Sequence, residues 1–378
     1  MAPVEITLAE SLAGVDPRAW DALAGDDDPF IEHRFLRALE TSGSVGAGTG
    51  WEPCHVLVHD GGRLVGAMPL YLKTQSYGEY IFDWGWANAA HRAGLDYYPK
   101  LVSAVPFTPA TGRRLLIRDA SVVPALVAGA HAAAEATDAS SIHVLFPTLG
   151  EVEALAASHG FLPRLSMQFH WESGGWASFE DFLGALRQPA RRQIRSERRQ
   201  AADSGLDFRV VRGTELDDAA WAALDLFYRD TADKKGAIPY LTPAFLAEVR
   251  RSMPERLIAA LATDGGGRPV AGAFGFQKGR HLYGRYWGTL SPHPALHFEL
   301  CYYRLIERCL AEGWTRFEAG AQGEHKLKRG LLPTATHSAH WLRDPGLRDA
   351  VARWLPQEAA AVRREMAELS THTPFKRG

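Results

Sequence analysis

The clearest pattern of apolar and polar positions is a β-hairpin that occurs twice. Between Cys54 and Leu72, apolar runs lie on both sides of Asp60-Gly61-Gly62. A second pair of runs, over residues 257–278, surrounds Asp264-Gly265-Gly266. Asp-Gly between apolar runs favours a tight turn, because glycine readily adopts positive φ. We therefore predict one such hairpin in each half of the chain.

Each hairpin is followed by a similar order of elements. In the first half these are an aromatic-rich segment, an Ala-rich helix and a strand (80–107, 122–136 and 142–146). In the second half they are a strand, a helix and a strand (281–287, 295–311 and 315–318). The repeated order predicts an α+β fold of two tandem domains, each a mainly antiparallel mixed sheet flanked by helices.

A polar, Gly-rich turn at residues 172–175 separates the two halves. We expect an N-terminal domain over 1–174 and a C-terminal domain over 175–378 that carries the active site. The C-terminal domain opens with a helix capped by Ser178, and Pro189 separates this helix from a second, strongly basic one.

Composition and charge narrow the class of protein. The chain has 378 residues, 46% hydrophobic residues and a net charge of −2. This composition excludes a largely disordered chain, and the charge argues against a DNA-binding protein. No apolar run approaches the roughly 20 residues that span a bilayer, and no signal peptide is evident. We expect a cytoplasmic protein with no membrane span.

The sequence lacks several common nucleotide-binding and catalytic motifs. It has no P-loop, no G-x-S-x-G elbow and no H-E-x-x-H motif. His337 and His340 fall in a β-like stretch, where an offset of three residues points them to opposite faces. We therefore expect no metal site and no tightly bound cofactor.

The densest cluster of polar residues lies between 317 and 341. Transfer to an amine needs a base for the nucleophile and a cation where the oxyanion forms. The candidates are Glu318 or His325 as the base, Lys326, Lys328 or Arg329 as the oxyanion stabiliser, and Gln322 and Glu324 as substrate contacts. The alternative is a solvated loop with surface charges.

Three further segments are candidates for binding. The strand and helix of 281–303 offer Arg285, Trp287, His297, Glu299 and Tyr302 to an acceptor, or to core packing. Residues 80–101 place Asp83 and His91 among tryptophans and tyrosines, which suits a sugar, peptide or base, or a packed loop. In the basic helix, Arg191, Arg195 and Arg198 share a face that suits donor phosphates, or simply solvent.

Four motifs together resemble the FemAB-like N-acyltransferase family of the wider Gcn5-related acetyltransferase superfamily. They are PFTPATGRRLL (106–116), LYGRYWG (282–288), LHFELCYY (296–303) and GAQGEHKLKRG (320–330). The resemblance covers nearly the whole chain and implies two acetyltransferase-like domains.

The resemblance also implies a chemistry. Fem ligases use aminoacyl-tRNA to extend peptidoglycan precursors, and a Phe-Lys-Lys-Gly-Phe-like stretch supplies the lysine that stabilises the transition state. The nearest match here is residues 327–331, which assigns that role to Lys328, with Arg329 beside it. Both Phe positions are Leu in this chain, so Lys326 is a rival.

We therefore expect an N-acyltransferase that moves an acyl or aminoacyl group to a small-molecule or peptide amine acceptor. Its co-substrate would be aminoacyl-tRNA or an acyl-CoA. The segment 288–298 lacks the glycines that hold the pyrophosphate of acetyl-CoA in simple acetyltransferases. The alternatives are a conventional acetyl-CoA-dependent N-acetyltransferase and a non-catalytic protein that recognises peptidoglycan or sugars.

Overall fold

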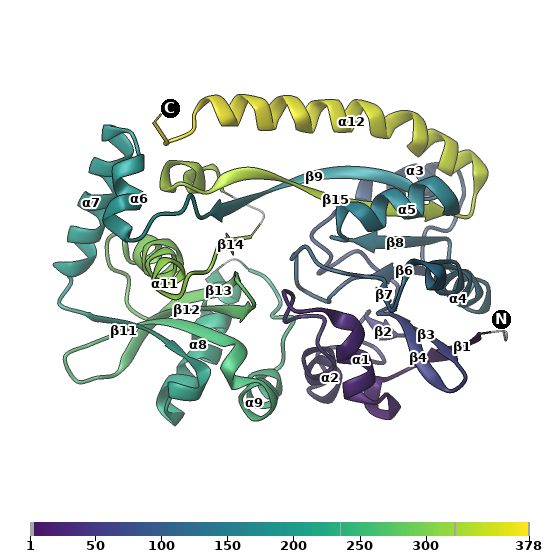
Figure 1. The fold of residues 1–378 in the computed structure, drawn as a ribbon, viewed down its shortest axis with the longest axis horizontal. Helices are drawn as coiled ribbons and strands as arrows, with labels where there is room; N and C mark the ends of the chain where they lie inside the picture. The colour runs from purple at the N-terminus through teal and green to yellow at the C-terminus, as the bar shows by residue number, and fades with distance from the viewer. Residues whose placement is uncertain (1–3, 235, 321–322, 377–378) are drawn as a thin grey trace. The chain divides into compact units, whose positions relative to one another are not determined.

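The chain forms two compact units in the computed structural model, which describes residues 4–234, 236–320 and 323–376 (Figure 1). Unit 1 comprises Met1–Met167 with Ala335–Glu365, and unit 2 comprises Gln168–Thr334 with Met366–Gly378. The sequence predicted one division of the chain, between residues 174 and 175. In the structure, residues 335–365 return to unit 1, although they follow Gln168–Thr334 of unit 2 in the sequence. That return is decided by strand pairing over a long sequence separation, which local patterns do not encode.

Unit 1 is built from short strands and helices. Its strands are β1 (Glu5–Ala9), β2 (Glu52–Pro53), β3 (His55–Asp60), β4 (Arg63–Met68), β5 (Tyr71–Lys73), β6 (Lys100–Ser103), β7 (Leu116–Ile117) and β8 (Ser141–Leu145). Its helices are α1 (Pro17–Ala24), α2 (His33–Thr41), α3 (Trp84–Arg92), α4 (Val123–Ala136) and α5 (Leu149–His159). Two strands, β9 (Leu162–Glu172) and β15 (Leu332–Leu342), and helix α12 (Pro345–Thr371) have residues in both units.

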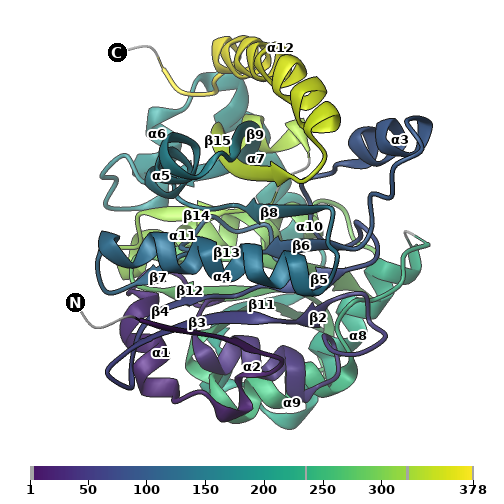
Figure 2. The ribbon, with the colours of Figure 1, turned by 90° about the vertical axis from the view of Figure 1, so that its right-hand side faces the viewer.

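The sheets of unit 1 are mainly antiparallel. One sheet has the order β1-β3-β4-β7, and the predicted first hairpin is confirmed because Asp60 pairs with Arg63 across its turn. The other strands follow the order β15-β8-β6-β5-β2, in which β6 and β8 are parallel. Helix α4 connects this parallel pair and packs its apolar face on β3 and β4 (Figure 2).

Unit 2 has the same order of elements on a larger scale. Its strands are β10 (Asp207–Arg212), β11 (Leu257–Thr263), β12 (Pro269–Lys278), β13 (His281–Thr289) and β14 (Arg316–Glu318). Its helices are α6 (Phe179–Ala185), α7 (Gln188–Ala202), α8 (Asp218–Lys234), α9 (Pro243–Ser252), α10 (Leu296–Phe298) and α11 (Arg304–Glu312). A π-helix, η5 (Glu299–Tyr303), joins α10 to α11, and a 3-10 helix, η6 (Glu324–Arg329), follows β14.

The unit 2 sheet has the order β10-β11-β12-β13-β14-β9. The second predicted hairpin is confirmed, because β11 pairs antiparallel with β12 around the glycine turn. Strands β13 and β14 are parallel and are connected through α11, as β6 and β8 are through α4. The predicted fold class, two acetyltransferase-like units with mixed sheets flanked by helices, is confirmed.

Helices cover both faces of the unit 2 sheet. Ala271 and Ala273 of β12 join the core cluster of α6, α7 and α11, while Gly272 between them faces Phe227 of α8. This follows from the alternation of side chains along a strand. Gly288 of β13 also lies against α8, where a Cβ would come within 1.9 Å of the Phe227 carbonyl oxygen. The close packing of α8 on β13 therefore requires glycine at position 288.

In the part of the chain that the structure describes, every helix is too short or too polar to cross a membrane.

Candidate active site

The 3-10 helix η6 divides the predicted catalytic residues between an inner and an outer edge. A 3-10 helix has three residues per turn, so side chains three positions apart eclipse each other. Lys326 and Arg329 form one such pair, and both are buried. His325 and Lys328 form the other, and both are exposed. The segment therefore presents an imidazole and an ammonium group together.

Arg329 is held by bonds from all three of its guanidinium nitrogens. Nε donates to Tyr303 Oη at 3.0 Å, Nη1 to the His325 carbonyl at 2.6 Å and Nη2 to Glu197 Oε1 at 2.7 Å. The guanidinium also lies 3.5 Å from the centre of the Phe298 ring, and the residue is only 2% exposed. Arg329 thus fixes η6 to the body of the unit.

Lys326 is also turned inward. Its Nζ donates to the Gly320 carbonyl at 2.8 Å, and the residue is 4% exposed. Lys328 is the predicted oxyanion stabiliser whose side chain lies on the outside of η6. Gln322 lies outside the described residues, and so does the side chain of Glu324.

His325 is suited to accept a proton. Partial desolvation of the ring by its neighbours, together with the nearby charges of Arg329 and Lys326, lowers its pKa below the ordinary 6.5, so the ring is neutral at pH 7. Its Nε2 lies 3.0 Å from Tyr302 Oη, and burial raises the pKa of that phenol, which stays protonated. The hydrogen bond orients the imidazole.

Two of the predicted acceptor-binding residues, His297 and Tyr302, lie against the ring of His325. His297 packs against Trp287 with 5.0 Å between ring centres, and lies 6.1 Å from the ring of His325. Arg285 occupies the irregularity at which β13 shifts register against β12. A bulge of this kind redirects a side chain within a strand.

The parallel pairing of β13 and β14 ends where this cluster begins. The pair is in register from His281 and Arg316 to Tyr283 and Glu318. Beyond Glu318 the chain leaves the sheet toward η6, while β13 continues to Thr289. The cluster therefore lies at the point where two parallel strands separate.

Glu318, the rival base, is less accessible than His325. It is 3% exposed, and its carboxylate lies 3.7 Å from Nε2 of His170. Burial and nearby cations lower the pKa of His170 to about 3, so this imidazole is neutral. A substrate reaches Glu318 less readily than it reaches the exposed edge of η6.

Glu299 is buried, and its carboxylate pairs with two arginines instead of facing solvent. Its Oε1 lies 2.7 Å from Arg304 and 3.3 Å from Arg198. Burial raises its pKa although both guanidinium groups oppose the shift. Glu299 and Tyr302 belong to the π-helix η5, and such wider turns occur frequently at functional sites.

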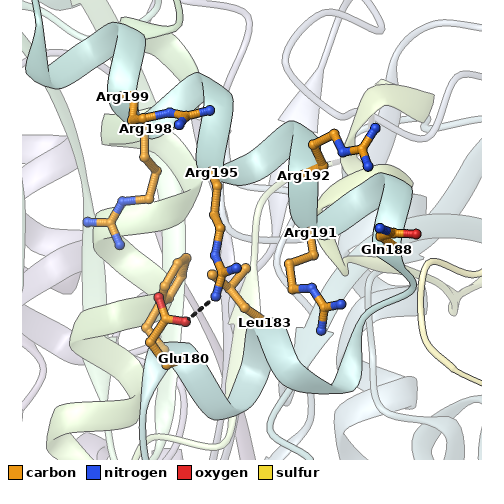
Figure 3. A pocket seen from close by; sticks show the side chains of 9 residues that line it. Glu180, Leu183, Gln188, Arg191, Arg192, Arg195, Arg198 and Arg199 are labelled. Carbon is orange, nitrogen blue, oxygen red and sulfur yellow. Dashed lines mark hydrogen bonds and ion pairs between the residues drawn. The ribbon is translucent and has the colours of Figure 1, made fainter.

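Helix α7 lines a pocket of about 530 Å³ with arginines (Figure 3). The predicted phosphate-binding residues all line it. The other lining residues are two further arginines, Gln188 of the same helix and three residues of α6. The full set is Arg191, Arg192, Arg195, Arg198, Arg199, Gln188, Phe179, Glu180 and Leu183. We call this the arginine pocket.

Only two of these arginines have a carboxylate partner in the part of the chain that the structure describes. Arg195 pairs with Glu180 at 2.6 Å, and Arg198 pairs with Glu299 and Glu307. The other three guanidinium groups, of Arg191, Arg192 and Arg199, make no ion pair in residues 4–234, 236–320 and 323–376. The pocket therefore has an excess of positive charge.

One turn of α7 links the arginine pocket to η6. Arg198 lines the pocket, and the preceding residue, Glu197, holds Arg329 and accepts a hydrogen bond from Tyr303 Oη. Glu197 and Tyr303 were not among the predicted site residues. The sequence signal that could have identified Glu197 is its position as the single acidic residue of the basic helix.

The residues predicted in the first half lie in unit 1. Asp83 is buried, accepts a hydrogen bond from Tyr97 Oη at 2.6 Å and pairs with Lys100. His91 is exposed on α3. Of the aromatic residues expected to line a pocket there, Trp86 and Tyr97 are buried in the core beneath α3.

The fold defines the class of protein: two units of acetyltransferase-like architecture, the second of which carries the cation-rich site. Residues 11–377 of the chain match the FemAB-like family, described as peptidoglycan biosynthesis/recognition. The chain belongs to this family. No protein with curated annotation matches its sequence.

Solved structures share the fold. FemX superposes with a TM-score of 0.55 at 12% identity, covering 92% of this chain and 100% of its own. The C-terminal domain of a putative lysylphosphatidylglycerol synthetase from Agrobacterium fabrum gives a TM-score of 0.53 at 12% identity, with 90% and 95% covered. L-PGS from Bacillus licheniformis gives a TM-score of 0.51 at 11% identity, with 90% and 97% covered. The comparisons therefore establish the family of this chain and its fold.

Proposed function

We propose that the chain transfers an aminoacyl group from aminoacyl-tRNA to an amine acceptor. The observation that carries the proposal is the exposed edge of η6, where His325 and Lys328 stand together. A neutral imidazole and an ammonium group are the base and the cation that acyl transfer to an amine requires.

In the proposed reaction, the amine nitrogen of the acceptor attacks the ester carbonyl of the donor. The C–N bond forms as His325 accepts the proton of the amine, and Lys328 stabilises the oxyanion. The C–O bond then breaks, and the leaving oxygen takes the proton back from His325. Holding donor and acceptor together supplies much of the rate.

The arginine pocket supports a donor with several phosphates. Arg191 to Arg199 extend over about 12 Å of helix, which is long enough to meet more than one phosphate group. A nucleic-acid backbone binds such a row of cations by displacing counterions. The proximity of Glu197 to Arg198 along α7 would couple a bound donor to η6.

The test is a parallel calorimetric titration with aminoacyl-tRNA and with acetyl-CoA at several salt concentrations. We expect tRNA to bind and acetyl-CoA to give no heat. Arg191→Ala should weaken tRNA binding and lower the slope of log K against log salt by about 1. The matched control is Arg209→Ala, because Arg209 is an exposed arginine of unit 2 outside the pocket.

Micromolar binding of acetyl-CoA with no binding of tRNA would overturn the choice of donor and favour a conventional acetyltransferase. If neither donor binds while cell-wall fragments do, the chain is a recognition protein and the transfer reaction is wrong.

A further inference from the structure

The chain that follows α12 pairs with the junction of α6 and α7. Phe375 forms an antiparallel β-bridge with Leu186. On one side of the bridge, the Arg187 amide donates to the carbonyl before Phe375 at 2.7 Å. On the other side, the backbone amide of the exposed Lys376 donates to the carbonyl before Leu186 at 2.9 Å. We call residues 373–375 the strap, because this pairing fastens the segment to unit 2.

The ring of Phe375 packs between two aromatic residues of the same unit. It stacks on Trp176, with 5.5 Å between ring centres and 8° between ring planes. It also meets Phe182 of α6 edge-on, with 6.2 Å between ring centres. Aromatic pairs of these geometries contribute more than the area they bury. The ring is therefore held in one orientation.

The tip of this ring lies against the residue that ends η6. Gly330 has a φ of +85°, and a Cβ there would lie 3.3 Å from Cζ of Phe375 and 2.9 Å from the ring of Phe182. Glycine meets both demands, since it adopts positive φ freely and has no Cβ. The Gly330 amide also closes the last turn of η6 by donating to the Leu327 carbonyl at 3.0 Å. Phe375 and Phe182 thus form the surface on which the end of η6 packs.

The end of η6 decides where the ammonium group of Lys328 lies. The next residue, Arg329, is held by its own side-chain partners, whereas Lys328 makes no ion pair with the residues that the structure describes. The position of its ammonium group therefore follows the backbone of η6 just before Gly330. In a transfer reaction, displacing a catalytic group by about 1 Å can cost about 10²-fold in rate.

The strap also pairs with elements that line the arginine pocket. Leu183 of α6 and Gln188 of α7 lie on either side of the junction, and both line the pocket (Figure 3). The strap therefore connects the support of η6 to the wall of the pocket.

We propose that Phe375 is a positioning residue for Lys328. It fixes the end of η6, and so it holds the ammonium group of Lys328 at the place where the oxyanion forms. The kinetic consequence rests on the proposed function, whereas the effect on the backbone of η6 does not depend on any reaction.

The first measurement is hydrogen exchange of the backbone amides of residues 324–331 in the whole protein, followed by mass spectrometry. Phe375→Ala leaves a space beside Gly330, so the amides of Gly330 and Leu331 should exchange about tenfold faster than in wild type. Phe375→Leu fills most of that space and should restore much of the protection. The pairing of the strap with α6 and α7 uses backbone atoms and remains in both variants.

The second measurement is steady-state aminoacyl transfer by the same variants. Phe375→Ala should lower kcat about tenfold and leave the KM of the donor nearly unchanged, because Lys328 shifts while the wall of the arginine pocket keeps its place. Phe375→Leu should restore much of kcat. A merely structural role of the ring would lower stability without this difference between kcat and KM.

The matched control is Phe208→Ala. Phe208 is a partly buried ring that packs on the same core, but it lies on β10, at the opposite edge of the unit 2 sheet from β9. Its loss should lower the free energy of unfolding, as the loss of Phe375 does, and leave the exchange of η6 and kcat near their wild-type values.

Equal exchange in wild type and Phe375→Ala would overturn the proposal. Equal kcat values in a chain that transfers would also overturn it, as would the same changes in Phe208→Ala. If wild type transfers no aminoacyl group, the proposed function is wrong, and the exchange rates alone decide whether Phe375 fixes η6.

Discussion

Lys328 lies one turn of 3-10 helix beyond His325, and both side chains are exposed on the same edge of η6. This relationship separates them from Lys326 and Arg329, which the same periodicity turns inward. Substitutions of these neighbouring basic residues should therefore have different effects: those on the outer edge of η6 should change turnover, and those on the inner edge should change stability.

Lys328→Ala should lower kcat of aminoacyl transfer by more than tenfold and leave the KM for the donor nearly unchanged. Loss of one donor to an oxyanion typically costs 10²- to 10³-fold in kcat. The measurement is steady-state transfer to the amine acceptor, with Lys376→Ala as an exposed control from the same unit. Unchanged turnover would remove Lys328 from the site.

Arg329→Ala should lower the free energy of unfolding. It removes three hydrogen bonds and leaves the carboxylate of Glu197 beside an empty space. Breaking a buried pair in this way costs about 3–5 kcal/mol. Urea unfolding measures the loss. Arg192 is an exposed arginine that makes no ion pair with the described residues, so Arg192→Ala should change the free energy of unfolding by less than about 0.5 kcal/mol. A loss for Arg329→Ala as small as for Arg192→Ala would contradict the buried role.

The pH profile should report on His325. Its pKa is lowered below 6.5, so the imidazole is already unprotonated at neutral pH. We expect kcat/KM to be level around pH 7 and to fall only on the acid side of 6.5, as the base gains a proton. His325→Gln should lower kcat/KM and abolish the acid limb. An acid limb that persists in His325→Gln would point to Glu318.

Two buried histidines of unit 1 should make the protein sensitive to acid. His143 and His340, paired across β8 and β15, share a hydrogen bond of 2.6 Å between their Nδ1 atoms. Burial lowers the pKa of His143 to about 3, and lowers that of His340 as well. Between about pH 6.5 and 3 the unfolded chain binds protons that the folded chain does not, so stability falls as the pH falls.

The expected slope is about 1.4 kcal/mol per pH unit for each histidine that stays neutral. The measurement is chemical unfolding at a series of pH values below 6.5. His143→Gln should reduce the slope, whereas His91→Gln, which changes an exposed histidine of the same unit, should leave it unchanged. Equal slopes for the two variants would show that burial of His143 does not control the acid response.

Much of the fold was predictable because its signals are local. The turns at Asp60-Gly61 and at Asp264-Gly265 determine their own hairpins, and the apolar spacing of α4 and α11 determines their inner faces. The basic face of α7 was also predictable from the sequence, because residues three and four apart lie on the same face of any helix. Each of these features needs only its neighbours in the chain.

Which residues of the site face outward was not predictable in the same way. The run from Glu324 to Gly330 is compatible with a loop, an α-helix or a 3-10 helix, and each would pair different side chains. Contacts from Glu197, Tyr303 and Phe298 select the 3-10 form by burying Arg329. Trp86 and Trp84 likewise differ in burial although they are two residues apart.

The sequence by itself therefore determined the duplicated order of elements and the basic helix, since these depend on local periodicity and turn residues. The tertiary structure decided the return of residues 335–365 to unit 1, the inner and outer edges of η6 and the exposure of Trp84 on α3. These depend on contacts between residues far apart in the chain, where burial and the pairing of charges decide which side chain faces solvent.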